Sequence, residues 1–184
     1  MKRLVVLFSG TGTNLAYILK NLHQKNGFEV VMALTNNPNA KGIEIAKSYN
    51  IKVEIVSNKD FDSREEFDRV VVDKINLYSP TLTVLAGFMR ILTPIFTDNI
   101  KSINLHPSLL PKYKGLHAIE RSFESGDNQA GVSVHWVTSE LDGGEIIIQK
   151  SFQRDNNISF EEFEDNIKRI EKEALKDAII EVLK

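Results

Sequence analysis

The sequence contains no cysteine, so its 184 residues can form no disulfide and offer neither a thiolate nucleophile nor a cysteine ligand for a metal. It also has no stretch approaching the ~20 consecutive apolar residues that a membrane-spanning helix requires. The apolar run at residues 4–8 is short and leads directly into Ser9-Gly-Thr-Gly, which favours a first strand over a signal peptide. We therefore expect a cytoplasmic protein that does not bind a membrane.

The sequence also has no excess of positively charged residues. Lysine and arginine number 23 and the acidic residues 25, which gives a net charge of -2. This balance argues against general nucleic-acid binding, although a local pocket for a small anion stays possible. The four histidines show neither His-x-x-x-His nor His-Glu-x-x-His spacing, so no metal site is predicted.

Apolar runs alternate with helical patterns along the chain. Strands are predicted at residues 4–8, 30–34, 53–56, 82–86, 102–105, 131–137 and 145–152, and helices at 15–22, 41–49, 63–75, 94–99, 118–124 and from 160 to the C-terminus. Capping boxes are predicted at Ser63 with Glu66 and at Ser159 with Glu162. The pattern predicts one domain, residues 1–184, of the α/β class with a doubly wound, mainly parallel sheet. Residues 131–137 alternate as a half-buried strand does, and the last two strands are expected to form an antiparallel edge.

A glycine loop, Ser9-Gly-Thr-Gly-Thr-Asn14, separates the first strand from the first helix. Glycines let backbone N–H groups approach an anion, and the helix N-terminus adds partial positive charge. The dinucleotide fingerprint is excluded because Leu15 stands where a third glycine would, and the Gly-Lys-Ser/Thr of a Walker loop is absent. The loop suits a single terminal phosphate, but a simple tight turn with a helix cap fits it equally well.

The segment Ile103-Asn-Leu-His-Pro-Ser-Leu-Leu-Pro111 ends a strand, because each proline lacks an N–H. Asn104 and His106 are two residues apart, so they point to the same side at the carboxyl end of a strand, where open α/β sheets bind ligands. On its own, this pattern is more often only a polar strand end. Asp142, followed by two glycines, either forms a turn or pairs with His106 and raises the pKa of the imidazole.

The other histidines have a weaker signal. His23 is expected to be solvated on the first helix, and His117 to cap a helix. His135 lies on the polar phase of its strand and could face the same crevice as His106, but a structural role is favoured over a catalytic one.

Four segments together resemble one family: Ser9-Gly-Thr-Gly-Thr-Asn-Leu15, Val84-Leu-Ala-Gly-Phe-Met-Arg-Ile-Leu92, Asn104-Leu-His-Pro-Ser-Leu-Leu-Pro111 and Leu141-Asp-Gly-Gly144. Their order and spacing are similar to those of the phosphoribosylglycinamide formyltransferases. The resemblance implies a Rossmann-like formyltransferase fold. It also implies transfer of a formyl group from 10-formyltetrahydrofolate to the amine of glycinamide ribonucleotide, through a tetrahedral intermediate, in purine biosynthesis. Two alternatives stay open: another formyl-folate enzyme of this fold, and a non-catalytic phosphate- or nucleotide-binding module.

The resemblance also implies roles for residues, by match to the family's motifs. The catalytic residues would be Asn104, His106 and Asp142. The acceptor would be bound by Gly12, Thr13, Asn14, Lys168, Arg169, Ile170 and Glu171. The formyl-folate cosubstrate would be bound by Arg64, Met89, Arg90, Ile91, Leu92, Asn104, Thr138, Ser139, Glu140, Leu141 and Asp142. The implied partners are these two small molecules, without a metal, and the protein would be a monomer or homodimer. The sequence departs from the family at Lys172, where histidine is usual, which weakens the assignment of the 168–171 segment.

Overall fold

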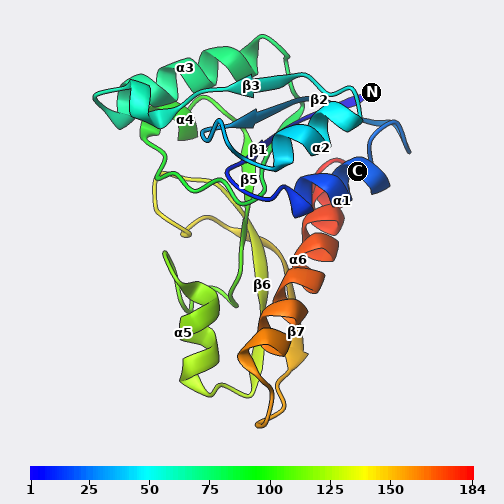
Figure 1. Ribbon diagram of the computed structural model, residues 1–184, viewed down its shortest axis with the longest axis vertical. Helices are drawn as coiled ribbons and strands as arrows, with labels where there is room; N and C mark the ends of the chain where they lie inside the picture. Colours follow the sequence, from blue (N-terminus) through cyan, green and yellow to red (C-terminus); the bar gives the residue numbers. More distant parts are fainter. The chain divides into compact units, whose positions relative to one another are not determined.

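The computed structural model describes all residues, 1–184, and divides them into two compact units, Met1–Asn104 and Leu105–Lys184. Strands and helices alternate along the chain (Figure 1). Only one strand, β5 (Ser102–His106), begins in the first unit and ends in the second.

The first unit contains a parallel sheet in the order β3-β2-β1-β4-β5. Its other strands are β1 (Lys2–Phe8), β2 (Phe28–Thr35), β3 (Val53–Ile55) and β4 (Leu82–Leu85). The continuous apolar run of β1 is buried because neighbouring strands pair with it on both sides and helices cover the sheet. Thus the buried run that the sequence shows at residues 4–8 is the centre of the sheet.

Helices connect these strands in the order expected for crossover connections. They are α1 (Thr13–Asn21), α2 (Gly42–Ser48), α3 (Arg64–Asn76) and α4 (Pro94–Thr97), with a 3-10 turn η1 (Asn58–Asp60). Helix α1 buries Leu15, Ile18 and Leu19, each contributing about 1.5–3 kcal/mol of apolar burial. Helix α1 packs against α2, and α3 packs against α4.

Only half of the predicted capping box at Ser63 forms. The Ser63 side chain accepts a hydrogen bond from the Glu66 N–H, as predicted. The Glu66 carboxylate, however, accepts from the N–H of Asp62, one residue earlier than a capping box requires. By contrast, both halves of the box form between Ser159 and Glu162.

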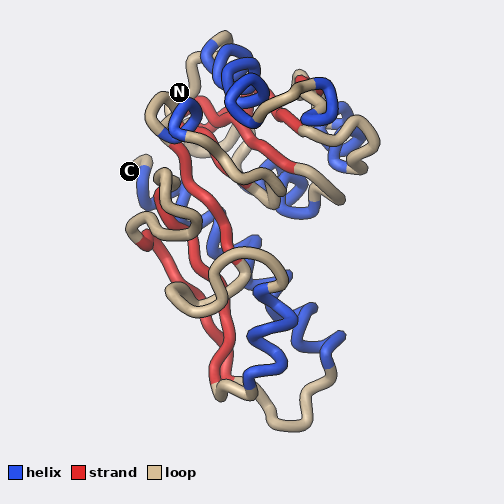
Figure 2. Tube along the Cα trace, turned by 90° about the vertical axis from the view of Figure 1, so that its left-hand side faces the viewer, coloured by secondary structure: helices blue, strands red, loops and turns tan.

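The second unit contains the antiparallel pair β6 (Gln129–Trp136) and β7 (Ile146–Gln153), with α5 (Ala118–Ser125) and α6 (Phe160–Val182). Figure 2 shows α6 running along this strand pair, against which it packs. The apolar stripe of α6, which includes Phe163, Ile167 and Leu175, is buried. The predicted antiparallel pairing is therefore confirmed.

The prediction that β6 is half-buried is wrong. Every residue from 130 to 135 is buried, including the polar phase. Ser133 is buried because its hydroxyl is fully hydrogen-bonded: it accepts from the Leu110 N–H at 3.0 Å and donates to the Ser108 carbonyl at 2.7 Å. A polar side chain that satisfies its hydrogen bonds can be buried without a large energetic cost.

The α/β class, the mainly parallel sheet and the antiparallel pair near the C-terminal half are confirmed. No helix has both the length and the hydrophobicity to cross a membrane. The assignment of residues 1–184 to a single domain stays a prediction.

Candidate active site

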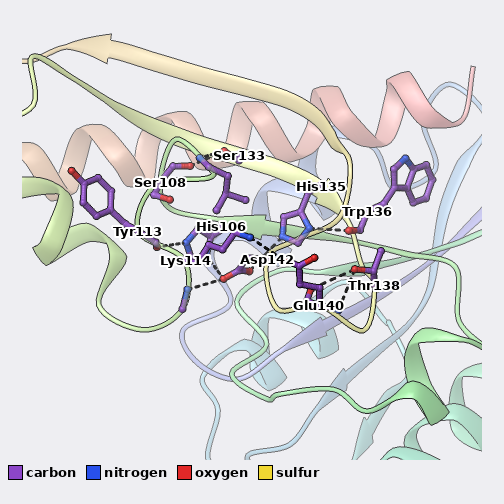
Figure 3. A network of polar contacts seen from close by, with 12 residues as sticks. His106, Ser108, Tyr113, Lys114, Ser133, His135, Trp136, Thr138, Glu140 and Asp142 are labelled. Carbon is purple, nitrogen blue, oxygen red and sulfur yellow. Dashed lines mark hydrogen bonds and ion pairs between the residues drawn. The ribbon is translucent and has the colours of Figure 1, made fainter.

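His106, the last residue of β5, is the centre of a buried polar cluster in the second unit (Figure 3). Its side chain is held at the strand end because Pro107 cannot continue the strand. His106 is 6% exposed and Asp142 is 8% exposed. The Nδ1 atom of His106 lies 3.4 Å from Oδ2 of Asp142, so the pairing predicted between these two residues is confirmed.

Asp142 is surrounded by groups that favour its charged form. The Gly115 N–H donates to Oδ2 at 2.8 Å, and Nε2 of His135 lies 3.5 Å from Oδ1. Burial acts to raise the pKa of Asp142, but His135, the Gly115 N–H and His106 outweigh it, so the pKa is below its ordinary value. Asp142 is therefore a buried carboxylate that stays ionised at neutral pH.

The segment after Leu141 also forms the tight turn that was one of the two interpretations of Asp142 and its glycines. Asp142 has a φ of +51°, in the left-handed region that aspartate tolerates better than most residues. A Cβ on Gly144 would lie 1.7 Å from the Trp136 carbonyl oxygen. Gly144 is thus required by the tight turn, and the same turn directs the Asp142 carboxylate inward.

The second ring nitrogen of His106 contacts the main chain. Nε2 lies 2.8 Å from the carbonyl oxygen of Tyr113, which can only accept a hydrogen bond, so Nε2 carries the proton. Burial lowers the pKa of His106, and this exceeds the opposing effects of the Tyr113 carbonyl and Asp142. The neutral ring therefore carries its proton on Nε2, and Nδ1, 3.4 Å from Asp142, donates to that carboxylate only when the ring takes up a second proton. The sequence-based expectation that Asp142 raises the pKa of His106 is correct for that contribution, but burial outweighs it and the net pKa is below its ordinary value.

His135 is the residue of this cluster that the sequence did not identify as a candidate. It is 3% exposed and contacts Asp142 through Nε2, while Nδ1 lies 2.8 Å from the carbonyl oxygen of Trp136. The sequence feature that could have identified His135 is its position on the polar side of a strand that leads directly into the 138–142 loop. The structure gives it a direct contact with the candidate carboxylate.

The two remaining histidines lie outside the cluster. His23 follows α1 instead of lying on it, and its Nδ1 accepts a hydrogen bond from the Val30 N–H at 3.1 Å, so the prediction of a solvated helix residue is wrong. His117 occupies the N-cap position of α5, as predicted, but its side chain makes no capping hydrogen bond.

Asn104 lies two residues before His106 on β5 and is paired in register with Leu85 of β4. Alternate residues of a strand project from the same face. An amide and an imidazole are therefore carried on one face of β5.

The glycine loop in the first unit has an open helix N-terminus. Gly12 is the N-cap of α1, no side chain caps the helix, and its first turn contains no acidic residue. Thr13 is exposed, and the Oδ1 atom of Asn14 is buried without a hydrogen-bond partner. Free N–H groups of the first turn, with a hydroxyl beside them, fit a phosphate group.

Gly12 is also required for packing. Its φ is +74°, and a Cβ there would lie 2.5 Å from the Cα of Gly42, the first residue of α2. The interpretation of the loop as a tight turn is thus confirmed, and binding of an anion there stays a prediction. A side chain at position 12 would disturb helix packing, so such a variant would not test phosphate binding alone.

A second candidate segment, residues 89–92, is joined to this loop through Ser9. The Ser9 hydroxyl accepts from the Met89 N–H at 2.8 Å and donates to Asn36 Oδ1 at 2.6 Å. Met89 is 71% exposed and Ile91 is 55% exposed, so two large apolar side chains of this segment face the solvent.

Arg90 lies between these two side chains in the sequence. Its guanidinium carbon is 5.2 Å from the centre of the Phe67 ring, and its Nε atom is buried without a partner. Exposed apolar side chains beside a guanidinium group fit an aromatic ligand that carries a carboxylate. Leu92 is half-buried, and Arg64 is the exposed first residue of α3.

The other predicted binding residues lie in the second unit. In the 138–142 loop, Glu140 pairs with Lys114 at 3.2 Å, and Ser139 and Leu141 are exposed. On α6, Ile170 is buried in the core, so its side chain is not available to a ligand. Lys168 is paired with Glu164 at 2.6 Å; Arg169 is exposed and Glu171 is half-buried.

Comparison with known proteins identifies the class of protein to which this chain belongs. Residues 2–179 match the family model described as formyl transferase, and the chain belongs to this family. It is 44% identical over 149 residues to the phosphoribosylglycinamide formyltransferase of Escherichia coli (strain K12), a match that covers 79% of this chain and 70% of that protein.

Solved structures agree with this comparison. The crystal structure of phosphoribosylglycinamide formyltransferase from Campylobacter jejuni subsp. jejuni NCTC 11168 is 52% identical, with a TM-score of 0.97 over 100% of this chain and 98% of that one. The enzyme of the same name from Bacillus halodurans is 32% identical, with a TM-score of 0.93 over 99% and 95% of the two chains.

Proposed function

We propose that this chain transfers a formyl group from 10-formyltetrahydrofolate to the amine of glycinamide ribonucleotide, a step of purine biosynthesis. The observation that carries the proposal is the buried pair of His106 and ionised Asp142 at the end of a parallel strand in a formyl transferase. The relatives named phosphoribosylglycinamide formyltransferase support the choice of acceptor.

In the reaction, the acceptor amine forms a bond to the formyl carbon, and the bond from that carbon to N10 of the folate breaks. One proton leaves the amine, and one reaches N10. The formyl oxygen gains negative charge as the tetrahedral intermediate forms. The Asn104 amide can donate a hydrogen bond to that oxygen.

His106 moves the proton. Because Nε2 is held by the Tyr113 carbonyl, Nδ1 is the nitrogen with a free lone pair, and it can take the proton that the amine releases. The resulting imidazolium faces Asp142, whose negative charge stabilises it. The imidazolium can then return the proton toward the leaving N10, so that His106 acts first as a base and then as an acid.

Binding is assigned to the segments with matching chemistry. The phosphate of the acceptor is held at the first turn of α1 by Gly12, Thr13 and Asn14. The folate is bound by the apolar side chains and the arginine of segment 89–92, with Arg64 and the 138–142 loop. The acceptor role of the 168–171 segment rests on the family match and falls to its polar residues, since Ile170 is buried.

Replacing Thr13 by valine tests the phosphate assignment without disturbing packing, because Thr13 is exposed and valine has the same shape. A hydrogen bond to a charged group contributes about 1.5–3 kcal/mol, so we expect KM for the acceptor to rise roughly tenfold or more while KM for the folate is unchanged. Steady-state kinetics with each substrate varied in turn measures this. Equal increases in both KM values, or no change in either, would count against the assignment.

The direct test of function is an assay of the purified chain with both substrates. Formylated acceptor and tetrahydrofolate should appear in equal amounts. Loss of formyl-folate without formylation of the acceptor would instead indicate a hydrolase, and no turnover at all would favour the non-catalytic binding module. A monomeric or homodimeric state and a cytoplasmic location are further proposals, to be checked by sedimentation and by imaging of the tagged protein.

A further inference from the structure

The turn at residues 112–115 holds the carbonyl group that His106 contacts. Tyr113 has a φ of +58°, and Gly115 a φ of +80°. A left-handed conformation at a residue such as tyrosine costs about 1–3 kcal/mol and persists only where surrounding contacts hold it. The Tyr113 carbonyl oxygen, 2.8 Å from Nε2 of His106, is therefore positioned by whatever fixes this turn.

The Tyr113 side chain is anchored away from the catalytic cluster. Figure 3 shows its ring directed away from His106, while its main chain faces the imidazole. The Tyr113 hydroxyl donates to Oδ2 of Asp127 at 2.8 Å, and Nζ of Lys112 lies 2.9 Å from the same oxygen. These two hydrogen bonds hold the pKa of Asp127 below its ordinary value, so the anchor is a carboxylate at neutral pH. Asp127 directly follows Gly126, the C-cap of α5.

Other contacts fix the rest of the turn. The Ser108 hydroxyl donates to the Lys112 carbonyl at 2.6 Å, and Arg121 of α5 donates to the Lys114 carbonyl. The Arg121 guanidinium also lies 6.0 Å from the centre of the Tyr113 ring. The side chain of Asp127 accepts the hydrogen bond of the Tyr113 hydroxyl. Asp127 does not itself contact the catalytic cluster of His106, Asp142 and His135.

We propose that Asp127 and Tyr113 are positioning residues for the proton transfer by His106. Asp127 anchors the Tyr113 hydroxyl, the anchored turn presents the Tyr113 carbonyl, and that carbonyl keeps the ring proton on Nε2. Nδ1 is then the ring nitrogen that takes up the proton, and Asp142, 3.4 Å away, stabilises the imidazolium that forms. This inference rests on the proposed function to the extent that His106 is the group that moves the proton.

Loss of the anchor has a definite chemical consequence. When the turn relaxes, Nε2–H loses its acceptor, and the proton can move to Nδ1 and bind Asp142 instead. The basic nitrogen is then Nε2, which faces away from Asp142. The charged groups that face His106 are Asp142 from the 138–142 loop and Arg121 from α5, together with His135 from β6, and all of them are retained.

The experiment compares Tyr113→Phe and Asp127→Ala with the wild type, since alanine, unlike asparagine, leaves no oxygen to accept the Tyr113 hydroxyl. Each is expected to lower kcat roughly tenfold, below the ~10²-fold that a 1 Å misplacement can cost, with both KM values unchanged. The double variant should be no slower than either single variant, because both remove the same contact. Lys112→Gln is the matched control. It removes the exposed ammonium group that also binds Asp127 but keeps the Tyr113 contact, so kcat should equal that of the wild type.

The ring nitrogens of His106 give a readout that does not depend on activity. Nitrogen NMR across a pH series should show the proton on Nε2 in the wild type and in Lys112→Gln, and a mixture with Nδ1–H in the two anchor variants. Wild-type kcat and an unchanged ring signal in Tyr113→Phe and Asp127→Ala would overturn the proposal. An inactive wild type that still shows the predicted tautomer shift would instead refute the proposed function. If Tyr113→Phe fails to fold, Asp127→Ala, which shortens a half-buried side chain, carries the same test.

Discussion

Replacement of His106 by alanine is expected to lower kcat for formyl transfer by about 10²–10⁴-fold, the contribution typical of a positioned acid or base. The physical reason is that Nδ1 is the neutral, lone-pair-bearing nitrogen beside the buried Asp142 carboxylate, and alanine offers no atom to receive the proton. Single-turnover kinetics with saturating substrates would measure the chemical step directly.

Two further variants make this result interpretable. His106→Asn fills most of the space of the buried ring and guards against a trivial loss of folding. His117→Ala removes an exposed imidazole that makes no capping hydrogen bond, so its rate should match the wild type. A His106 variant that folds and retains more than about a tenth of the wild-type kcat would rule out a role in proton transfer.

Asp142→Asn is expected to have the second-largest effect, lowering kcat by about 10²-fold or more. Asparagine keeps the shape of aspartate but removes the negative charge that stabilises the imidazolium of His106. Asp142 raises the pKa of His106 against the larger effect of burial, so without it that pKa falls further. The acidic limb of the kcat/KM profile should therefore move to lower pH; a move to higher pH would contradict the proposed arrangement.

The same substitution changes how stability depends on pH. The pKa of Asp142 is lowered in the folded state, so its charge stabilises the fold above the unfolded value of 3.8, and this contribution is lost as pH falls through the folded pKa. The pKa of His106 is also lowered, so the fold loses stability as pH falls below 6.5. Urea unfolding of Asp142→Asn across pH should keep the loss of stability below pH 6.5 that belongs to His106 and lack the more acidic loss that belongs to Asp142.

The fold was predictable where burial depends on local sequence. The continuous apolar run of β1 indicated a strand covered on both faces, and the Ser159–Glu162 capping box marked the start of α6. The alternation in β6 was misleading, because its polar phase is buried through Ser133, which binds the main chain at Leu110 and Ser108. Such a partner is distant in the sequence and is a backbone group, so no residue pattern indicates it.

The chemistry of the candidate site was predictable only where it depends on residue types and not on how the chain folds. The complementarity of His106 and Asp142 could be inferred from residue types alone. The direction of the His106 pKa could not, since it depends on how deeply the folded chain buries the ring. The contact with the Tyr113 carbonyl was also beyond sequence reasoning, because every residue carries a carbonyl group and only the fold selects one.

The close contact between Gly12 and Gly42 links the turn proposed to bind phosphate to the hydrophobic core. A Cβ on Gly42 would lie 2.4 Å from the ring of Phe8, and a Cβ on Gly12 would lie 2.5 Å from the Cα of Gly42. The ring of Phe8, buried at the end of β1, thus sets how near α2 comes to the first turn of α1. The volume of that ring cannot change independently of the first turn of α1, so the phosphate contacts proposed for that turn and the packing of the sheet are under one common constraint.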